Sequence, residues 1–121
     1  MAVPLYQTKA EFFRTLGHPV RIRVLELLGD GPRAVRDLLA DIDVEASSLS
    51  QQLAVLRRAG IVTSTREGGT VTYALAGPDV ADLMRAARSF LTQIIAGQAE
   101  LLHELGDEPA RAGPRAGMLA A

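Results

Sequence analysis

The chain has 121 residues, of which 48% are hydrophobic, so one folded domain with a modest core is expected. The absence of cysteine excludes disulfides, thiol redox chemistry and thiolate zinc sites. The sequence contains no apolar run of about 18 residues, so a transmembrane helix is not expected. A formal net charge of −1 does not indicate nucleic-acid binding through a general excess of positive charge, so any such binding would depend on a few placed arginines. No signal-peptide pattern is evident, and the expected location is the cytoplasm.

Three helices are expected before residue 41. The first spans residues 5–17 and gathers apolar side chains on one side. Pro19 follows a break at Gly17 and suits the first position of a second helix, over residues 20–29. Its inward side chains are expected to be Ile22, Leu25 and Leu28, and its outward ones Arg21, Arg23 and Glu26. A short third helix over residues 33–40 leads into a turn, in which Asp43 is expected to cap the helix that follows.

The fourth helix, over residues 45–58, carries Leu49, Leu53 and Leu56 at positions i, i+4 and i+7, which makes one apolar stripe. The opposite face is centred near Gln51 and is small and polar. Gly60 ends the helix with a left-handed conformation. Residues 46–66 contain three arginines and no acidic residue, although the whole chain is slightly acidic.

Two β-branched, alternating segments follow, over residues 61–66 and 70–75, and the Glu67-Gly68-Gly69 link between them predicts a hairpin. A last helix over residues 79–105 carries an apolar stripe along its whole length. Such a stripe needs a partner, so a homodimer is expected. Residues 106–121 are rich in glycine, proline and alanine and are expected to form a flexible tail after a single domain over residues 1–105.

The predicted fold is mainly α (α+β), with four helices, a two-stranded hairpin and a long helix. Two helices joined by a tight turn and followed directly by a hairpin make a winged helix-turn-helix. The homodimer is expected to form through the first and last helices. The expected interface residues are apolar: Phe12, Phe13, Leu83, Phe90, Ile94 and Leu101.

Three segments resemble the ArsR/SmtB family of bacterial repressors: LGHPVRIRVLELL (16–28), SSLSQQLAVLRRAGIV (47–62) and the hairpin as far as Tyr73. The resemblance covers about residues 8–105. In that family a Ser-x-His-Leu pattern precedes a Leu-x-x-Ala-Gly-Leu/Ile-Val ending, and here Gln52 replaces the histidine. The resemblance implies a cytoplasmic homodimeric transcription factor, a repressor rather than an activator, that binds a near-palindromic double-stranded DNA operator. In many members a metal ion releases the DNA.

DNA recognition is expected through the helix over residues 45–58 and the wing over residues 61–75. Gln51 offers a donor and an acceptor together, which suits the major-groove edge of adenine. Ser47 and Ser48 flank it as further base contacts. The residues expected to hold the DNA backbone are Ser50, Gln52, Arg57 or Arg58 on the helix and Arg66 and Thr70 on the wing, where the minor groove is the alternative. The alternative interpretation of the helix residues is an ordinary solvated face.

The metal sites that the resemblance implies are incomplete. Ala34-Val35-Arg36 stands where the family has a Cys-Val-Cys motif. Phe90, Thr92 and Gly106 stand where three ligands of a site on the last helix are expected. The remaining candidate on that helix is a weak Ni²⁺ or Zn²⁺ site, with nickel the first metal to test. Its candidate ligands are Glu100, His103, Glu104 and Asp107, with a solvated polar face as the alternative. His18, before Pro19, suits a loop or cap role better than metal ligation.

Three interpretations follow. The first is a DNA-binding regulator, the second a regulator that is effector-independent or controlled by another protein, and the third a winged-helix module that binds protein. An enzyme is not expected, because no nucleophile–base constellation and no Gly-rich phosphate loop is present.

Overall fold

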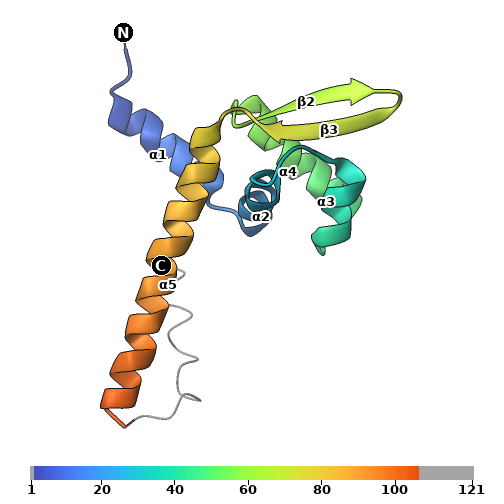
Figure 1. Cartoon of the computed structure of the whole chain (residues 1–121). Helices are drawn as coiled ribbons and strands as arrows, with labels where there is room; N and C mark the ends of the chain where they lie inside the picture. The colour runs from blue at the N-terminus through green and yellow to red at the C-terminus, as the bar shows by residue number, and fades with distance from the viewer. Residues whose placement is uncertain (1, 107–121) are drawn as a thin grey trace. The chain divides into compact units, whose positions relative to one another are not determined.

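The structure is a computed structural model that describes residues 2–106, so the expected tail lies outside the described residues from Asp107 onward. The chain divides into two compact units, Met1–Met84 and Arg85–Ala121. Its elements follow one another in this order (Figure 1): α1 (Leu5–Leu16), α2 (Pro19–Leu28), β1 (Arg33–Ala34), α3 (Val35–Asp41), α4 (Ala46–Arg58), β2 (Val62–Glu67), β3 (Thr70–Leu75) and α5 (Pro78–Glu104).

The core of the first unit is built from leucine-rich faces of α1 to α4 and the start of β2. Helix α2 packs against α4, and α4 in turn packs against β2. Helix α2 buries more than one face, because Val24 and Leu27 are buried as well as the expected Leu25 and Leu28. The complete buried cluster is Leu16, Val24, Leu25, Leu27, Leu28, Leu38, Ile42, Leu49, Leu53, Leu56, Ile61 and Val62.

The ends of the helices follow local chemistry that the sequence largely indicates. Pro19 occupies the first position of α2, as expected, and the His18 side chain caps that helix. Gly60 has a φ of 77°, which confirms the left-handed conformation after α4. The expectation for Asp43 was wrong: α4 begins at Ala46 with Glu45 at the cap position and no side-chain cap hydrogen bond. The turn continues through Val44, whose N–H donates to the Ile42 carbonyl at 2.9 Å, so Asp43 lies too early.

The sheet has three antiparallel strands in the order β1-β3-β2. The hairpin is confirmed, with Glu67 opposite Thr70 and with Gly68 and Gly69 at φ 54° and 83°. Two successive positive φ angles suit the tight turns that match strand twist. Strand β1 was not expected, because a two-residue strand has no alternation of its own; Arg33 and Ala34 are extended because they pair with Tyr73 and Thr72.

The second unit contains the part of α5 that follows Met84. This part of the helix, with the residue that follows it, exposes several large apolar side chains: Phe90, Leu91, Ile95, Leu101 and Leu105. Within residues 2–106, no helix is both long enough and apolar enough to cross a bilayer. The winged helix-turn-helix, formed by α3, α4 and the β2–β3 hairpin, lies in the first unit.

Candidate nucleic-acid interface

Helix α4 presents one face to the core and the other to solvent. Leu49, Leu53 and Leu56 have relative exposures of 0%, 1% and 0%, which confirms the predicted stripe. The side chains on and around the opposite face are all exposed: Ser47, Ser48, Ser50 and Gln51. They are short or have flexible amide ends, so a base edge can approach the helix closely.

Three exposed arginines extend this polar face. Arg57 and Arg58 lie in the last turn of α4, where positive charge complements the helix dipole, and Arg66 lies near the end of β2. None of the three forms an ion pair or a side-chain hydrogen bond with the part of the chain that the structure describes. No acidic residue lies within residues 46–66 to compete for them. Their charges are thus available to phosphates.

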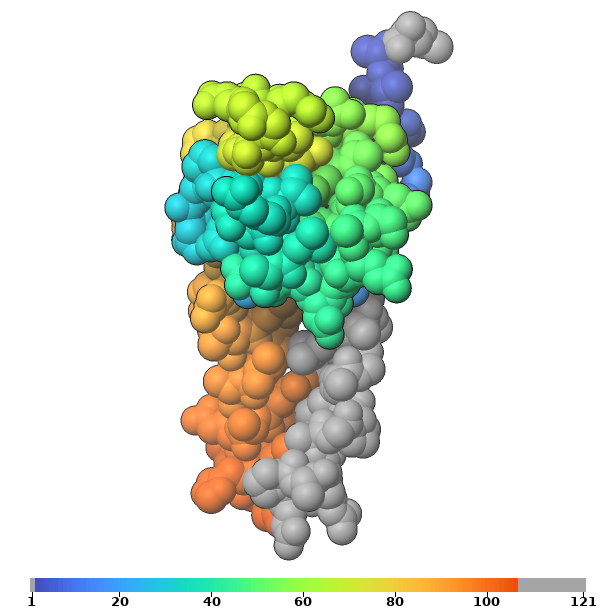
Figure 2. All heavy atoms as spheres, turned by 90° about the vertical axis from the view of Figure 1, so that its right-hand side faces the viewer, coloured from blue at the N-terminus to red at the C-terminus, as the bar shows by residue number. Residues whose placement is uncertain are grey.

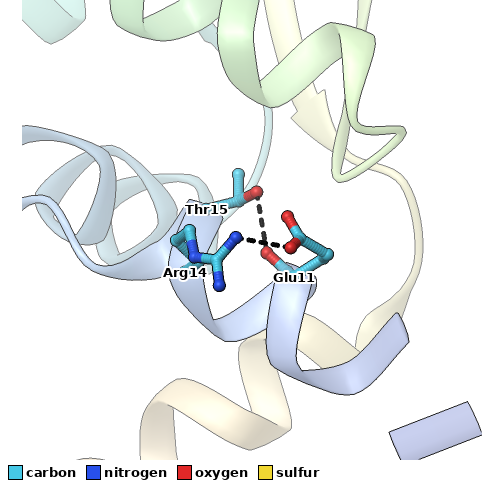
Figure 3. Close-up of polar contacts among 3 residues, drawn as sticks. All are labelled: Glu11, Arg14 and Thr15. Atoms are coloured by element: carbon cyan, nitrogen blue, oxygen red, sulfur yellow. Dashed lines mark hydrogen bonds and ion pairs between the residues drawn. The ribbon is translucent and has the colours of Figure 1, made fainter. Parts of the chain in front are cut away.

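Three other arginines of the first unit form ion pairs with acidic neighbours. Arg14 donates to the carboxylate of Glu11 within α1 (Figure 3). Arg23 pairs with Glu26 at 3.4 Å within α2, and Arg33 pairs with Asp41 at 2.8 Å at the two ends of the β1–α3 segment. Arg36 on α3 is likewise exposed and has no ion pair among the described residues, so the exposed unpaired arginines of the first unit lie on α3, α4 and the wing.

The wing lies beside the two helices of the motif. Figure 2 shows α3 and α4 on one side of the first unit, with the β2–β3 hairpin along its edge. In the hairpin Arg66 pairs with Val71 and Glu67 with Thr70, so Arg66 and the half-buried Thr70 lie next to the turn. A strand end of this kind can reach the DNA backbone beside a groove that holds α4.

Gln52 differs from its exposed neighbours because it is half-buried on the flank of α4 and has a partner. The Nε–H of Arg21 donates to Oε1 of Gln52 at 2.8 Å, and Nη1 of Arg21 donates to the Thr15 carbonyl at 3.0 Å. The sequence interpretation placed Arg21 on the outer face of α2; instead it is half-buried and joins α1, α2 and α4. No local pattern could have indicated this contact, since 31 residues separate Arg21 from Gln52.

The predicted metal ligands do not form a site within one described chain. Among residues 2–106 no group of three His, Asp or Glu side chains is arranged to hold an ion, so Glu100, His103 and Glu104 do not converge. The fourth candidate, Asp107, lies outside the described residues. The cap role of His18 is confirmed, because its Nδ1 accepts the N–H of Val20 at 3.1 Å.

The predicted dimer residues fall into two groups. Phe12 and Leu83 are half-buried and pack against the core of their own chain, so part of their surface is already covered. Phe13 meets Phe12 edge-to-face at 5.4 Å, yet it remains 54% exposed. On α5, Ile94 is half-buried, and Phe90 and Leu101 are 62% and 55% exposed.

The fold and the polar face of α4 define the class of protein: a winged helix-turn-helix DNA-binding transcriptional regulator. The sequence pattern described as "bacterial regulatory protein, arsR family" matches residues 18–64. The HTH-type transcriptional regulator Rv0081 of Mycobacterium tuberculosis is 50% identical over 103 residues, which cover 84% of this chain and 90% of that protein. The chain belongs to the arsR family of bacterial regulatory proteins, which confirms the resemblance seen in the sequence and excludes the enzyme class.

Solved structures agree with this assignment. The crystal structure of Rv0081 matches with a TM-score of 0.73 and 49% identity, over 81% of this chain and 99% of that one. The transcriptional repressor BigR from Xylella fastidiosa matches with a TM-score of 0.67 and 34% identity, over 70% and 87%. The homodimeric winged helix-turn-helix domain of Mb0332 from Mycobacterium bovis matches with a TM-score of 0.61 and 31% identity, over 82% and 86%.

Proposed function

We propose that this protein is a cytoplasmic homodimeric repressor that binds a near-palindromic operator through α4 and the β2–β3 wing. The observation that carries the proposal is the exposed, acid-free face of α4, which runs into arginines that have no partner among the described residues. The similarity to the repressor BigR supports repression, and the similarity to the homodimeric Mb0332 domain supports a dimer. Two copies of such a face match the two half-sites of a palindrome.

The contacts divide by role. Ser47, Ser48 and Gln51 face base edges in the major groove, where an amide can bind adenine through one donor and one acceptor. Ser50 and Gln52 contact phosphates from the flanks of α4. Three arginines supply the charge that binds the backbone, two at the end of α4 and one on the wing, where Thr70 assists: Arg57, Arg58 and Arg66.

The test is the affinity of the protein for DNA from upstream of its own gene, measured by fluorescence anisotropy over a range of salt concentrations. Wild-type protein should bind one site tightly, with a logarithmic affinity that falls linearly with the logarithm of salt. The double variant R57Q/R58Q should lower the magnitude of that slope by about one for each arginine that contacts a phosphate.

Arg14→Gln provides the control, because Arg14 is also exposed but is paired with Glu11 on α1. It should leave the salt slope unchanged. Absence of binding at low salt, or equal slopes for wild type and R57Q/R58Q, would contradict the assignment of this surface to DNA.

Release of the operator by a metal is a finer form of the proposal, with Ni²⁺ tested first and then Zn²⁺ and Co²⁺. Its candidate ligands are the imidazole of His103 and the carboxylates of Glu100, Glu104 and Asp107, which offer nitrogen and oxygen donors to such ions. The three that are described do not form a site within one chain, so an ion would have to draw them together. The test is operator affinity at fixed salt with and without each metal. Loss of affinity that H103A abolishes would establish the metal response, and unchanged affinity would favour an effector-independent or protein-controlled regulator.

A further inference from the structure

Arg21 connects three helices of the first unit through two hydrogen bonds. Its Nε–H donates to Oε1 of Gln52 on α4 at 2.8 Å, and Nη1 donates to the Thr15 carbonyl on α1 at 3.0 Å. Thr15 lies in the last turn of α1, where carbonyl groups lack partners within the helix, so Arg21 satisfies one of them. Both Arg21 and Gln52 are half-buried, and the contact is thus built into the packing of α2 on α4.

The chemistry of the guanidinium group determines how the Gln52 amide is oriented. Guanidinium has only N–H donors, so the atom of Gln52 that faces Arg21 must be the amide oxygen. The amide nitrogen lies on the other arm of the same planar group and retains its two donors. The amide oxygen is held toward Arg21 with one of its two lone pairs occupied, so the group that Gln52 keeps wholly free for a DNA molecule is its NH₂ donor.

Gln51 keeps both kinds of group. It is exposed, and it forms no side-chain hydrogen bond with residues 2–106. A free amide can read adenine with one donor and one acceptor. An amide whose oxygen is held by Arg21 presents its NH₂ group instead, and that donor matches a phosphate oxygen, which is present at every base pair. The two adjacent glutamines are thus suited to different kinds of hydrogen bond with DNA.

We propose that Arg21 is a positioning residue that converts Gln52 into a sequence-independent phosphate donor and leaves base reading at this point of α4 to Gln51. The proposal rests on the DNA-binding function proposed above and assigns a role to a residue that lies on another helix. Arg21 holds the Gln52 side chain in its binding orientation before DNA arrives, so less side-chain freedom is lost on binding. Its second bond, to Thr15, anchors the guanidinium to α1 and limits the positions that it can adopt.

The test is a double-mutant cycle in the full-length protein with R21M, Q52A and R21M/Q52A. Affinities are measured for the operator and for a scrambled duplex at one salt concentration. Methionine keeps the unbranched stem of Arg21 and removes its donors. Each single variant should lose about threefold to tenfold in affinity per half-site, the range expected for one hydrogen bond, and by the same factor on both duplexes. The double variant should lose no more than Q52A alone.

The control is Arg23→Met, which removes the same charge from the same helix at an exposed position whose only described ion pair is with Glu26. It should change affinity by less than about twofold, since a solvent-exposed charge away from the contact is screened. R21K keeps the charge but not the planar two-armed donor, so it should lose affinity like R21M. A merely structural role for Arg21 would lower affinity equally in the wild-type and Q52A backgrounds.

A second measurement does not depend on the folding of any variant. The side-chain NH₂ resonances of Gln52 in the wild-type protein should shift on addition of DNA, to the same extent with operator and scrambled duplexes. The proposal is overturned if the losses of binding free energy caused by R21M and Q52A add in the double variant. It is also overturned if Q52A alters discrimination at one base pair, or if the Gln52 resonances do not shift when DNA is added. Failure of wild-type protein to bind any duplex would instead overturn the DNA-binding function, and this proposal with it.

Discussion

Gln51 and Gln52 are neighbours with identical side chains, yet α4 gives their amides different surroundings. Gln51 is exposed, whereas Gln52 is half-buried and accepts a hydrogen bond from Arg21. At about 100° per residue, a step of one position carries a side chain from the solvent face to the flank of the helix. The hydrogen bonds that each glutamine can form with DNA therefore depend on its position around α4 and on its partner, not on its residue type alone.

Gln51→Ala should relax base discrimination at one position in each half-site. Removal of a bidentate amide–adenine pair is expected to lower the affinity for the preferred base by about 1–3 kcal/mol relative to the other three bases. The measurement is the affinity for a set of operators that differ at single base pairs. Affinity for a scrambled duplex should stay the same. A uniform loss on all duplexes would show that Gln51 contacts the backbone.

Leu53→Ala tests the buried side of the same helix. Leu53 is 1% exposed and lies within the core cluster, so its truncation leaves a cavity and should lower the free energy of unfolding by about 2–5 kcal/mol. Urea denaturation followed by circular dichroism gives this value. Gln51→Ala provides the control on the opposite face and should change stability by less than about 0.5 kcal/mol. Equal stability for the two variants would contradict the assignment of α4 faces.

At the scale of elements, much of the structure can be predicted from local chemistry. The leucine stripe of α4, proline at the start of α2 and two glycines in the hairpin turn each act within a few residues. Features that depend on a distant partner could not be predicted in this way. Strand β1 exists because β3 is beside it, and Asp43 fails as a cap because the turn at Val44 delays the start of α4.

His18→Ala should destabilise α2 at its N-terminus. The imidazole Nδ1 accepts the N–H of Val20 at 3.1 Å, one of the donors that a helix start leaves without a partner. Loss of a side-chain cap typically lowers the free energy of unfolding by about 1 kcal/mol. Thermal or urea denaturation measures the effect, and His18→Asn should recover most of it because asparagine is a good cap residue. No recovery with asparagine would indicate that His18 acts through packing instead of capping.

At the scale of the whole molecule, the residues of the candidate interface could be predicted from the sequence, but the tertiary contacts that hold them in place could not. The acid-free segment and the polar face of α4 are visible in the sequence, because they belong to consecutive residues. The Arg21–Gln52 bond and the packing of Phe12 and Leu83 on their own core join residues far apart in the chain. Tertiary packing decides such contacts, and helical periodicity alone placed Arg21 on the outer face of α2.

If the protein binds its operator as the proposed dimer, the apolar face of α5 is part of the DNA-binding function. Phe90 and Leu101 are 62% and 55% exposed in one described chain, and they share one stripe of the helix. If a second copy covers that stripe, Phe90→Glu places a carboxylate in an apolar seam, where an unpaired charge is strongly unfavourable. Light scattering should then show the mass of one chain where the wild-type protein shows two.

The same Phe90→Glu variant should lose about a hundredfold or more in operator affinity, because two linked half-site contacts become two independent binding events. Affinity for a single half-site should change little, since α4 and the wing lie in the first unit and Phe90 in the second. Thr92→Glu adds the same charge to an exposed position off the apolar stripe and should remain a dimer that binds the operator like wild type. A dimeric Phe90→Glu protein would exclude this face from the interface, and full operator affinity in a monomeric one would show that dimerisation does not drive recognition.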